Sequence, residues 1–400
     1  MRSPLDGITI LDLTIWQNGP WGTVMLSDMG ANVIKIEDPV NGDPARGVIG
    51  TTPTPETVNA FFETMNRNKR SMTLDLRCQE GREVFYRMTG KADVITENFR
   101  VGVVERLGVD YETIRKINPR IIYASNSGFG DLGPDAGDGV YDVLAQARGG
   151  FMWMNSLGER EIEYRMNGGI ADQIGAIILA YGIMAAVVAR ERFGIGQHIQ
   201  TSLFQAQLTF QAMFLNRFLL NGSPPIFDGR KAAMNPLLNT YKCGDGKWVA
   251  MGCAQSDRYW TEFCTRLGAP DLIDDPRCAN HVERMKNCVA IIERLDQLFL
   301  AKPSSEWVKI LKGRGILIGP VQTYSDIPDD PQVVANQFIT TLDSPTYGKM
   351  REVGPPVKMS ETPPFARSPA PEFGQHTEEV LLEFGFTWED IGELHQKKAI

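Results

Sequence analysis

Short β-branched apolar segments alternate with helical segments through the first 200 residues, and this alternation constrains the fold more than any other feature of the sequence. Strands are predicted at 8–14, 32–37, 71–76, 93–98, 121–130 and the beginning of 196–220. Helices are predicted around 21–29, 82–92, 112–119 and 172–192. Because a helix between consecutive strands returns the chain to the same edge, the strands should be parallel. The sequence therefore predicts an α/β fold whose ligand lies beyond the carboxyl ends of the strands.

The chain changes character after residue 220. Residues 221–236 are rich in Gly, Pro and polar side chains and are predicted to form a linker, followed by a smaller α+β domain over 237–323. The predicted elements of this domain are a hairpin at 239–253, helices at 256–267, 281–302 and 305–315, and a strand at 316–323. Residues 324–375 are Pro-rich and are predicted to be irregular, and two short amphipathic helices are predicted in the tail.

Composition limits the partners that this chain can have. Lys plus Arg total 41 and Asp plus Glu total 49, so the net charge of −8 is unfavourable for nucleic-acid binding. The most apolar stretch, 173–189, falls short of the ~20 residues of a membrane span and is predicted to be a buried helix. We find no apolar signal-peptide core, and the six cysteines and four histidines lack disulfide or metal spacing. These observations predict a cytoplasmic protein with reduced thiols, no metal and no membrane partner.

The first strand–helix turn, TIWQNGPWG at 14–22, is a weak candidate for a dinucleotide site. A dinucleotide fingerprint needs G-x-G-x-x-G there, whereas only Gly19 and Gly22 are present and Pro20 lacks a backbone donor. Glu37 stands where an acid that binds ribose would follow the second strand. Because only one of the several features of a dinucleotide site is present, the sequence argues against a nicotinamide cofactor.

Basic residues occur just before the predicted strand 71–76, after that strand, and after the strand 93–98. Parallel strands could bring them to one edge of the sheet, where they would bind phosphates. They are Arg67, Lys69, Arg70, Arg77, Arg100 and Arg106. The alternative is a solvated charged face, which is the commoner interpretation of a single run such as NRNKR at 66–70.

Asp172 lies at the beginning of the most apolar helix, and its position alone favours a plain helix N-cap. The alternative is a carboxylate nucleophile beside Gly168 and Gly169, which would let a ligand come close. A carboxylate can attack a thioester and form a mixed anhydride. Asp142 follows another glycine loop, and position alone favours a cap or turn there as well. No histidine lies in the first 197 residues, so a Ser-His-Asp arrangement is not indicated.

Several motifs occur in order along nearly the whole chain. They are PLDGITILDLT, LSDMGANVIKIEDPVNGDPAR, NRNKRSMTLDL, KADVITENFRVGVVERLGVDYETIRKINPRIIYASNSGFG, YDVLAQARGG, GQHIQTSLFQAQ, YKCGDGKWV and APEFGQHTEEVLLEFG. Together they resemble the class III coenzyme A transferases, the formyl-CoA and carnitine CoA-transferase (CaiB/BaiF) family. The resemblance implies a Rossmann-like large domain, 1–220, that a return segment, 324–400, completes. It also implies a smaller domain inserted between them, and two chains interlocked as a homodimer.

The resemblance also implies roles for individual residues. Asp172 would be the nucleophile, with Gln17 and Asp142 beside it in supporting catalytic roles. Contacts to coenzyme A would come from Arg106, Asn98, Leu74, Arg77, Leu107 and Tyr141. Coenzyme A would act as substrate and carrier, with no metal and no nicotinamide.

This sequence departs from the family pattern in three places. Asp38 stands where the formyl-CoA enzyme has a basic residue for CoA phosphates, and Gly139 stands where it has a Lys. The glycine-rich flap of that enzyme is not evident between 221 and 260, which weakens formate and oxalate as substrates. We therefore expect the contacts to coenzyme A to differ in detail.

The implied reaction moves CoA from an acyl-CoA donor, for which succinyl-CoA is our guess, to a free carboxylic acid. It would pass through an aspartyl anhydride and an aspartyl-CoA thioester. One alternative is an α-methylacyl-CoA racemase, which needs a His where Gly139 and Val140 stand. Another is one subunit of a heteromeric transferase. The acceptor acid is the main gap, and a dicarboxylic or aryl-substituted acid is our guess. Phe151, Met152, Trp153 and Met154 could wall a pocket for an aromatic or branched acid, or pack in the core.

Overall fold

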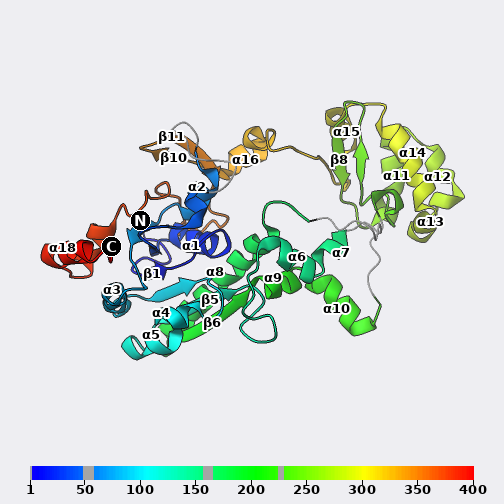
Figure 1. Cartoon of the computed structure of the whole chain (residues 1–400). Coiled ribbons are helices and arrows are strands. Elements are labelled where there is room, and N and C mark those ends of the chain that lie inside the picture. Colours follow the sequence, from blue (N-terminus) through cyan, green and yellow to red (C-terminus); the bar gives the residue numbers. More distant parts are fainter. Residues whose placement is uncertain (1, 48–57, 156–164, 224–228) are drawn as a thin grey trace. The chain divides into compact units, whose positions relative to one another are not determined.

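The computed structural model describes residues 2–47, 58–155, 165–223 and 229–400 (Figure 1). The chain divides into two compact units. The larger unit contains 1–153, 164–223 and 334–400, and the smaller contains 154–163 and 224–333. The domain boundaries given above stay a prediction.

A parallel six-stranded sheet forms the centre of the larger unit, which confirms the predicted α/β class. Its strands are β1 (Thr9–Asp12), β2 (Asn32–Glu37), β3 (Arg70–Thr73), β4 (Val94–Glu97), β5 (Ile122–Ser127) and β6 (Gln197–Ser202). The order across the sheet is β3-β2-β1-β4-β5-β6, which is that of a doubly wound dinucleotide-binding fold. Leu11 of β1 lies opposite Ile34 of β2 and Ile95 of β4. The strand order reverses between β1 and β4, and ligands of such folds bind beyond the strand ends at that point.

Successive residues of the strands face two separate cores, as the two-residue period of a strand requires. Ile10 and Val33 belong to the core shared with α1 (Asn18–Asp28) and α8 (Ile170–Phe193). Their neighbours Leu11 and Ile34 belong to the core on the opposite face. That face is covered by α3 (Gln79–Thr89), α5 (Tyr111–Ile117), α17 (Thr377–Glu383) and α18 (Trp388–Gln396).

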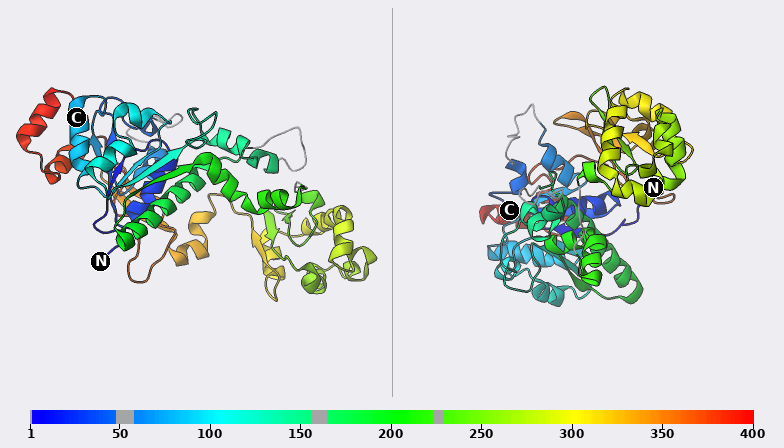
Figure 2. Two further views of the ribbon diagram at one scale, coloured as in Figure 1. Left: turned by 90° about the horizontal axis from the view of Figure 1, so that it is seen from below. Right: turned by 90° about the vertical axis from the view of Figure 1, so that its right-hand side faces the viewer.

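Helix α8 runs beside β5 and β6 (Figure 2) and is the apolar helix predicted at 172–192. Its buried residues recur at helical spacing, at Ala176, Leu179, Ala180, Ile183, Ala186 and Val187. Its opposite side exposes Ile177, Tyr181 and Val188. Within the described residues, α8 is the one helix long and apolar enough to cross a membrane, and it packs on the sheet of this unit.

The prediction that 324–375 is irregular is wrong in part. This segment contains α16 (Pro331–Asn336) and an antiparallel hairpin of β10 (Ile339–Ser344) and β11 (Gly348–Val353). Leu342 and Met350, which face each other across the hairpin, are its buried apolar residues. Because most other positions are exposed, the sequence shows little strand periodicity.

Shorter elements complete the larger unit. They are η1 (Pro44–Gly47), α2 (Ala60–Asn66), α4 (Val103–Leu107), α6 (Asp142–Arg148), α7 (Phe151–Asn155), α9 (Leu203–Phe210) and α10 (Ala212–Asn221). The single helix predicted within 196–220 is therefore two helices, separated at Gln211.

The smaller unit contains the predicted hairpin of β7 (Thr240–Lys242) and β8 (Trp248–Met251), joined by β9 (Ile318–Pro320). Its helices are η2 (Arg230–Ala232), α11 (Ser256–Leu267), α12 (Asp271–Asp274), η3 (Pro276–Cys278), α13 (His281–Lys286), α14 (Cys288–Phe299), α15 (Ser304–Leu311) and η4 (Ile327–Asp329). The helix predicted at 281–302 is divided at Asn287. All six cysteines are free, and Cys243, Cys253, Cys264 and Cys278 are buried in this unit.

Candidate functional site

A pocket of about 310 Å³ opens beyond the carboxyl ends of β1, β4 and β5 in the larger unit, where the strand order reverses. It brings together Asp172, Asn98 and Tyr141, which sequence reasoning assigned to one site. The other residues that line it are Ile15, Trp16, Asn18, Phe99, Arg100, Val101, Val103, Asn126, Ser127, Gly128, Ala136, Asp138, Gly139, Val140 and Leu203.

Asp172 lies in the first turn of α8, but it is not the N-cap that its position suggested. The N-cap is Gly169, which adopts a left-handed φ of +69°, and its neighbour Gly168 has a φ of +90°. The first turn is capped from another helix, because Asp142 Oδ1 of α6 accepts a hydrogen bond of 2.7 Å from the backbone N–H of Ala171. The Asp172 carboxylate is therefore free to line the pocket.

The surroundings of Asp172 favour its neutral form. Burial, together with the negative charge of Asp142, raises the pKa of Asp172 to about 7. In the part of the chain that the structure describes, no group donates a hydrogen bond to this carboxylate. A carboxylate without such partners is a stronger nucleophile when it ionises, and a raised pKa in a pocket is a common property of functional sites.

Gln17 and Asn18 contact the glycine segment and the first turn of α8. Gln17 Nε2 donates to the carbonyl of Gly168 over 3.4 Å, and a Cβ on Gly169 would lie 2.4 Å from Gln17 Nε2. Asn18 Nδ2 donates to the backbone carbonyl of Asp172 at 3.0 Å. Asn18 Oδ1 is buried without a partner among the described residues. Sequence reasoning missed Asn18, although its place directly after Gln17 in the β1–α1 turn was a usable signal.

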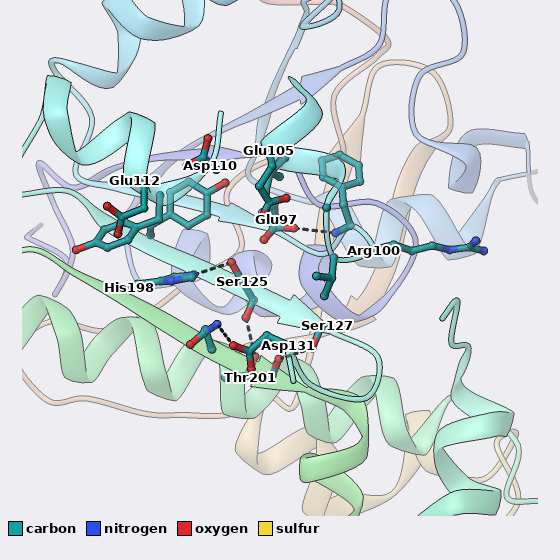
Figure 3. A pocket seen from close by; sticks show the side chains of 17 residues that line it. Glu97, Arg100, Glu105, Asp110, Glu112, Ser125, Ser127, Asp131, His198 and Thr201 are labelled. Atoms are coloured by element: carbon teal, nitrogen blue, oxygen red, sulfur yellow. Dashed lines mark hydrogen bonds between the residues drawn. The ribbon is translucent and has the colours of Figure 1, made fainter. Parts of the chain in front are cut away.

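Arg100 reaches the pocket over a glycine. A Cβ on Gly139 would lie 2.3 Å from Arg100 Nη2, so this guanidinium occupies the space that any larger residue would need. Figure 3 shows Arg100 extending away from Glu97 and His198 of a neighbouring pocket. The formyl-CoA enzyme has a Lys where this chain has Gly139. Here the Arg100 guanidinium, from the loop after β4, lies near that position.

The other residues assigned to coenzyme A lie outside this pocket's lining. Arg106 is exposed on α4, and Leu107 beside it is partly buried. Leu74 is 2% exposed and packs in the core that α3 covers. Arg77 is exposed and forms ion pairs with Asp75 at 2.8 Å and with Asp38 at 2.7 Å.

The basic cluster considered as a phosphate site does not assemble as such. Arg67 is buried against Asp28 at 2.7 Å and Glu352 at 3.3 Å. Lys69 is buried against Asp12 at 3.0 Å. Arg70 pairs with Glu379 and Glu383 of α17. These three cations are therefore paired within the fold, and they form neither a phosphate site nor a solvated face.

Glu37 is likewise used within the fold. Its carboxylate pairs with Arg46 at 2.7 Å and accepts a hydrogen bond from Ser71 at 2.6 Å, which leaves it poorly placed to bind ribose. Among the described residues we find no group of three or more His, Cys, Asp or Glu that could hold a metal ion. The aromatic run after the second glycine loop does not line the pocket either, and Phe151 packs against Phe210.

A second pocket, of about 180 Å³, adjoins the first and shares Phe99, Arg100, Val101 and Ser127 with it (Figure 3). Its lining is acidic, with Glu97, Glu105, Asp110, Glu112 and Asp131. Burial raises the pKa of Glu97 to about 7. His198 contacts Ser125 at 2.9 Å in this pocket and stacks on Tyr111. An anionic ligand is disfavoured here, because the carboxylates outnumber the cations.

Comparison with known proteins gives a consistent result. Residues 5–377 match the model of "CoA-transferase family III". An acetyl-CoA:oxalate CoA-transferase of Acetobacter aceti is 34% identical over 96% of each chain. A succinyl-CoA:mesaconate CoA-transferase of Haloarcula hispanica is 33% identical over 95% of this chain and 96% of its own. The crystal structure of a CAIB/BAIF family protein from Brucella suis is 30% identical, with a TM-score of 0.84 over 96% of this chain and 100% of its own.

Proposed function

Since this chain belongs to CoA-transferase family III and is a CoA-transferase, we propose that Asp172 is the residue that carries the acyl group and then CoA. One observation supports this assignment above all. Asp172 faces the pocket with no hydrogen-bond donor of its own among the described residues, while Asp142 caps the helix in its place. If Asp172 served only to cap α8, its carboxylate would be expected to accept the Ala171 N–H, which Asp142 accepts instead.

The proposed reaction has two exchanges. The Asp172 carboxylate attacks the thioester carbonyl of the donor, so that a C–O bond forms, the C–S bond breaks and CoA leaves as a thiolate. The thiolate attacks the aspartyl carbonyl, which releases the donor acid as a carboxylate and leaves CoA on Asp172. An acceptor carboxylate then attacks this thioester, and the released thiolate attacks the acceptor carbonyl and restores the Asp172 carboxylate. Each thioester is replaced by another, so no other energy source is required.

Gln17 is the proposed donor to the oxyanions that form in these steps. Its Nε2 is held by one long bond to Gly168, so it can turn toward a reacting carbonyl with little loss. Asp142 keeps a supporting role through its bond to Ala171 and through its charge beside Asp172.

We propose that coenzyme A binds in the pocket that contains Asp172. Asn98 and Tyr141 line the pocket, and we propose further contacts from Arg106, Leu107, Leu74 and Arg77. Arg77 would exchange its exposed pairs with Asp38 and Asp75 for a phosphate, a small cost because exposed ion pairs contribute only ~0–1 kcal/mol. This exchange would give a role to the acid at residue 38, where the formyl-CoA enzyme has a basic residue.

The proposed donor is succinyl-CoA, and the proposed acceptor is a dicarboxylic or aryl-substituted acid. The name of the Haloarcula hispanica relative, which includes succinyl-CoA and mesaconate, supports this choice. The name of the Acetobacter aceti relative includes oxalate. The absence of an evident glycine-rich flap is therefore a weaker argument against oxalate as a substrate. A racemase finds less support, because the described residues that line the pocket include no histidine.

We propose a cytoplasmic, interlocked homodimer, with a heteromer containing a related subunit as the alternative. Helix α10 supports an assembly, because none of its residues is buried although it carries Met213, Phe218, Leu219 and Leu220. Helix α8 also exposes apolar residues, Ile177, Tyr181 and Val188.

Mass spectrometry of the intact protein mixed with succinyl-CoA, and separately with other acyl-CoAs, tests the function. Hydroxylamine or borohydride traps an aspartyl thioester, and peptide mapping locates it. We expect an adduct on Asp172 and the largest amount of adduct with the true donor. If no acyl-CoA gives an adduct, exchange of the α-proton with deuterium tests the racemase, and co-expression with a related subunit tests the heteromer.

A further inference from the structure

The turn that carries Gln17 to the site, residues 14–18, is held by side chains from elsewhere in the sheet. Asn98, at the end of β4, binds Ile15 twice. It accepts from the Ile15 N–H at 2.9 Å and donates to the Ile15 carbonyl at 2.8 Å. The Asn98 amide thus fixes Ile15, two positions before Gln17, while Asn98 also lines the pocket.

The residues on either side of Ile15 are held by a buried ion pair. Lys35 Nζ lies 2.7 Å from Asp43 Oδ2, and both side chains are fully buried. Lys35 also donates to the carbonyl of Thr14 at 2.8 Å, and Asp43 Oδ1 accepts the N–H of Trp16 at 3.1 Å. The pair therefore binds the turn at its beginning and at the residue that precedes Gln17.

Trp16 is the residue that most needs such support. It has a φ of +67°, in the left-handed region that a large side chain rarely adopts. This conformation sets the direction in which the chain enters α1 and presents Gln17 to the Gly168 carbonyl. A strained residue at a functional site persists only where its surroundings hold it.

The charges beneath the turn form a larger buried set. Asp12 and Lys69 are paired at 3.0 Å beside Lys35 and Asp43, so two cations balance two anions. Burial alone would raise the pKa of Asp12, but Lys69 and Lys35 lower it below its ordinary value. Burial lowers the pKa of Lys35, and the charges of Asp43 and Asp12 more than reverse this effect. Buried ion pairs are costly to desolvate, so their presence is weak evidence that they stabilise the fold. A role other than stability should therefore be considered for them.

We infer that the Lys35–Asp43 pair is a positioning element that holds Trp16 in its left-handed conformation and thereby places Gln17 for catalysis. This inference rests on the proposed function, because it assigns a task to Gln17. The pair touches neither the reacting atoms nor Asp172 and acts only through the turn. Its loss should therefore slow the chemical step more than it weakens acyl-CoA binding.

The test is the single-turnover rate at which succinyl-CoA, or whichever acyl-CoA gives most adduct, labels Asp172 in the full-length protein. The variant is Asp43→Asn, which keeps an acceptor oxygen but removes the charge that holds Lys35. We expect the rate at saturating acyl-CoA, per folded molecule, to fall ~10–100-fold, since misplacement by about 1 Å can cost that much. The KM for acyl-CoA should change less than ~3-fold, because uniform binding is retained.

The matched control is Asp28→Asn, which breaks the buried Arg67–Asp28 pair in the same unit but leaves the turn alone. This control should lower thermal stability and keep the rate per folded molecule. Because Asp43→Asn leaves Lys35 as an unpaired buried charge, the double change Lys35→Met with Asp43→Asn provides a variant that removes both charges together. It too should slow the chemical step.

A double-mutant cycle with Gln17→Ala separates positioning from general loosening. If Asp43 acts through Gln17, Asp43→Asn should lower the labelling rate by less than ~3-fold in the Gln17→Ala background. The inference is overturned if Asp43→Asn labels at the wild-type rate, if Asp28→Asn slows labelling equally, or if the two effects simply multiply. A wild-type protein that forms no adduct with any acyl-CoA overturns the proposed function, and this inference with it.

Discussion

The Asp142 carboxylate accepts the backbone N–H of Ala171 at 2.7 Å, and through this bond a residue of α6 caps α8. Asp172, one residue further along, is left without a donor and faces the pocket. This division of work between two acids underlies the first three predictions below.

Replacement of Asp172 by Ala should abolish formation of the covalent adduct and reduce transfer at least ~1000-fold, because no other group is placed to carry the acyl intermediate. The measurement is steady-state transfer together with intact mass after hydroxylamine trapping. Asp131→Asn is the control, since Asp131 is an acid of the second pocket that accepts a hydrogen bond from Gln200. Transfer by Asp172→Ala near the wild-type rate would remove Asp172 from the mechanism.

Ionisation of Asp172 should control the pH dependence of both chemistry and stability. Its pKa is about 7 in the folded protein, against 3.8 for the ordinary group, so labelling should rise with pH through about 7 and then level off. The folded state binds this proton more tightly than the unfolded state, so wild-type stability should fall as pH rises from about 4 to about 7. Asp172→Asn cannot ionise and should unfold a few degrees above wild type at pH 8 but not at pH 4. A constant difference between the two melting temperatures over this range would contradict the assignment.

The two roles of Asp142 should separate in two substitutions. Asp142→Asn keeps an oxygen for Ala171 but removes a negative charge, so the pKa of Asp172 should fall and the labelling profile should shift to lower pH. Asp142→Ala also removes the cap and should cost an additional ~1 kcal/mol of stability. Calorimetry and the labelling profile measure the two effects. Equal stability in the two variants would show that the bond to Ala171 contributes little.

Gly139→Ala should displace Arg100, because the added Cβ would lie 2.3 Å from Arg100 Nη2. A flexible guanidinium can move aside, so we expect normal folding and a several-fold higher KM for acyl-CoA if Arg100 meets its anionic part. Gly137→Ala is the matched control in the same loop, since a Cβ there meets nothing within 4 Å. Arg100→Met should have the same effect as Gly139→Ala, and their combination should add little. Equal KM values for the two glycine variants would exclude Arg100 from binding.

Much of the larger unit could be predicted from the sequence, because its signals are local. The strand β2 was predicted at its observed bounds, and α8 within two residues at each end, since β-branched runs and helical apolar spacing are properties of neighbouring residues. The hairpin of β10 and β11 was missed, because its exposed strands lack the apolar alternation on which the prediction depends.

The residue types of the site were also present in the sequence, but their tasks were decided by contacts between distant segments. Position along the chain favoured Asp172 as the helix cap, whereas a hydrogen bond from Ala171 to Asp142, 29 residues away, gives that task to Asp142. The cations of NRNKR suggested a phosphate site, whereas burial against Asp12 and Asp28 uses two of them in the fold.

The sequence by itself thus determined the α/β class, the strands of the sheet and the long helix α8 that packs on it. Its ordered motifs also determined the family. The tertiary structure alone decided which acid caps and which lines the pocket, and which cations are paired in the interior. The physical reason is that periodicity and propensity act over a few residues. The pKa of a carboxylate and the partner of a buried charge depend instead on groups that only the folded chain brings within a few ångströms.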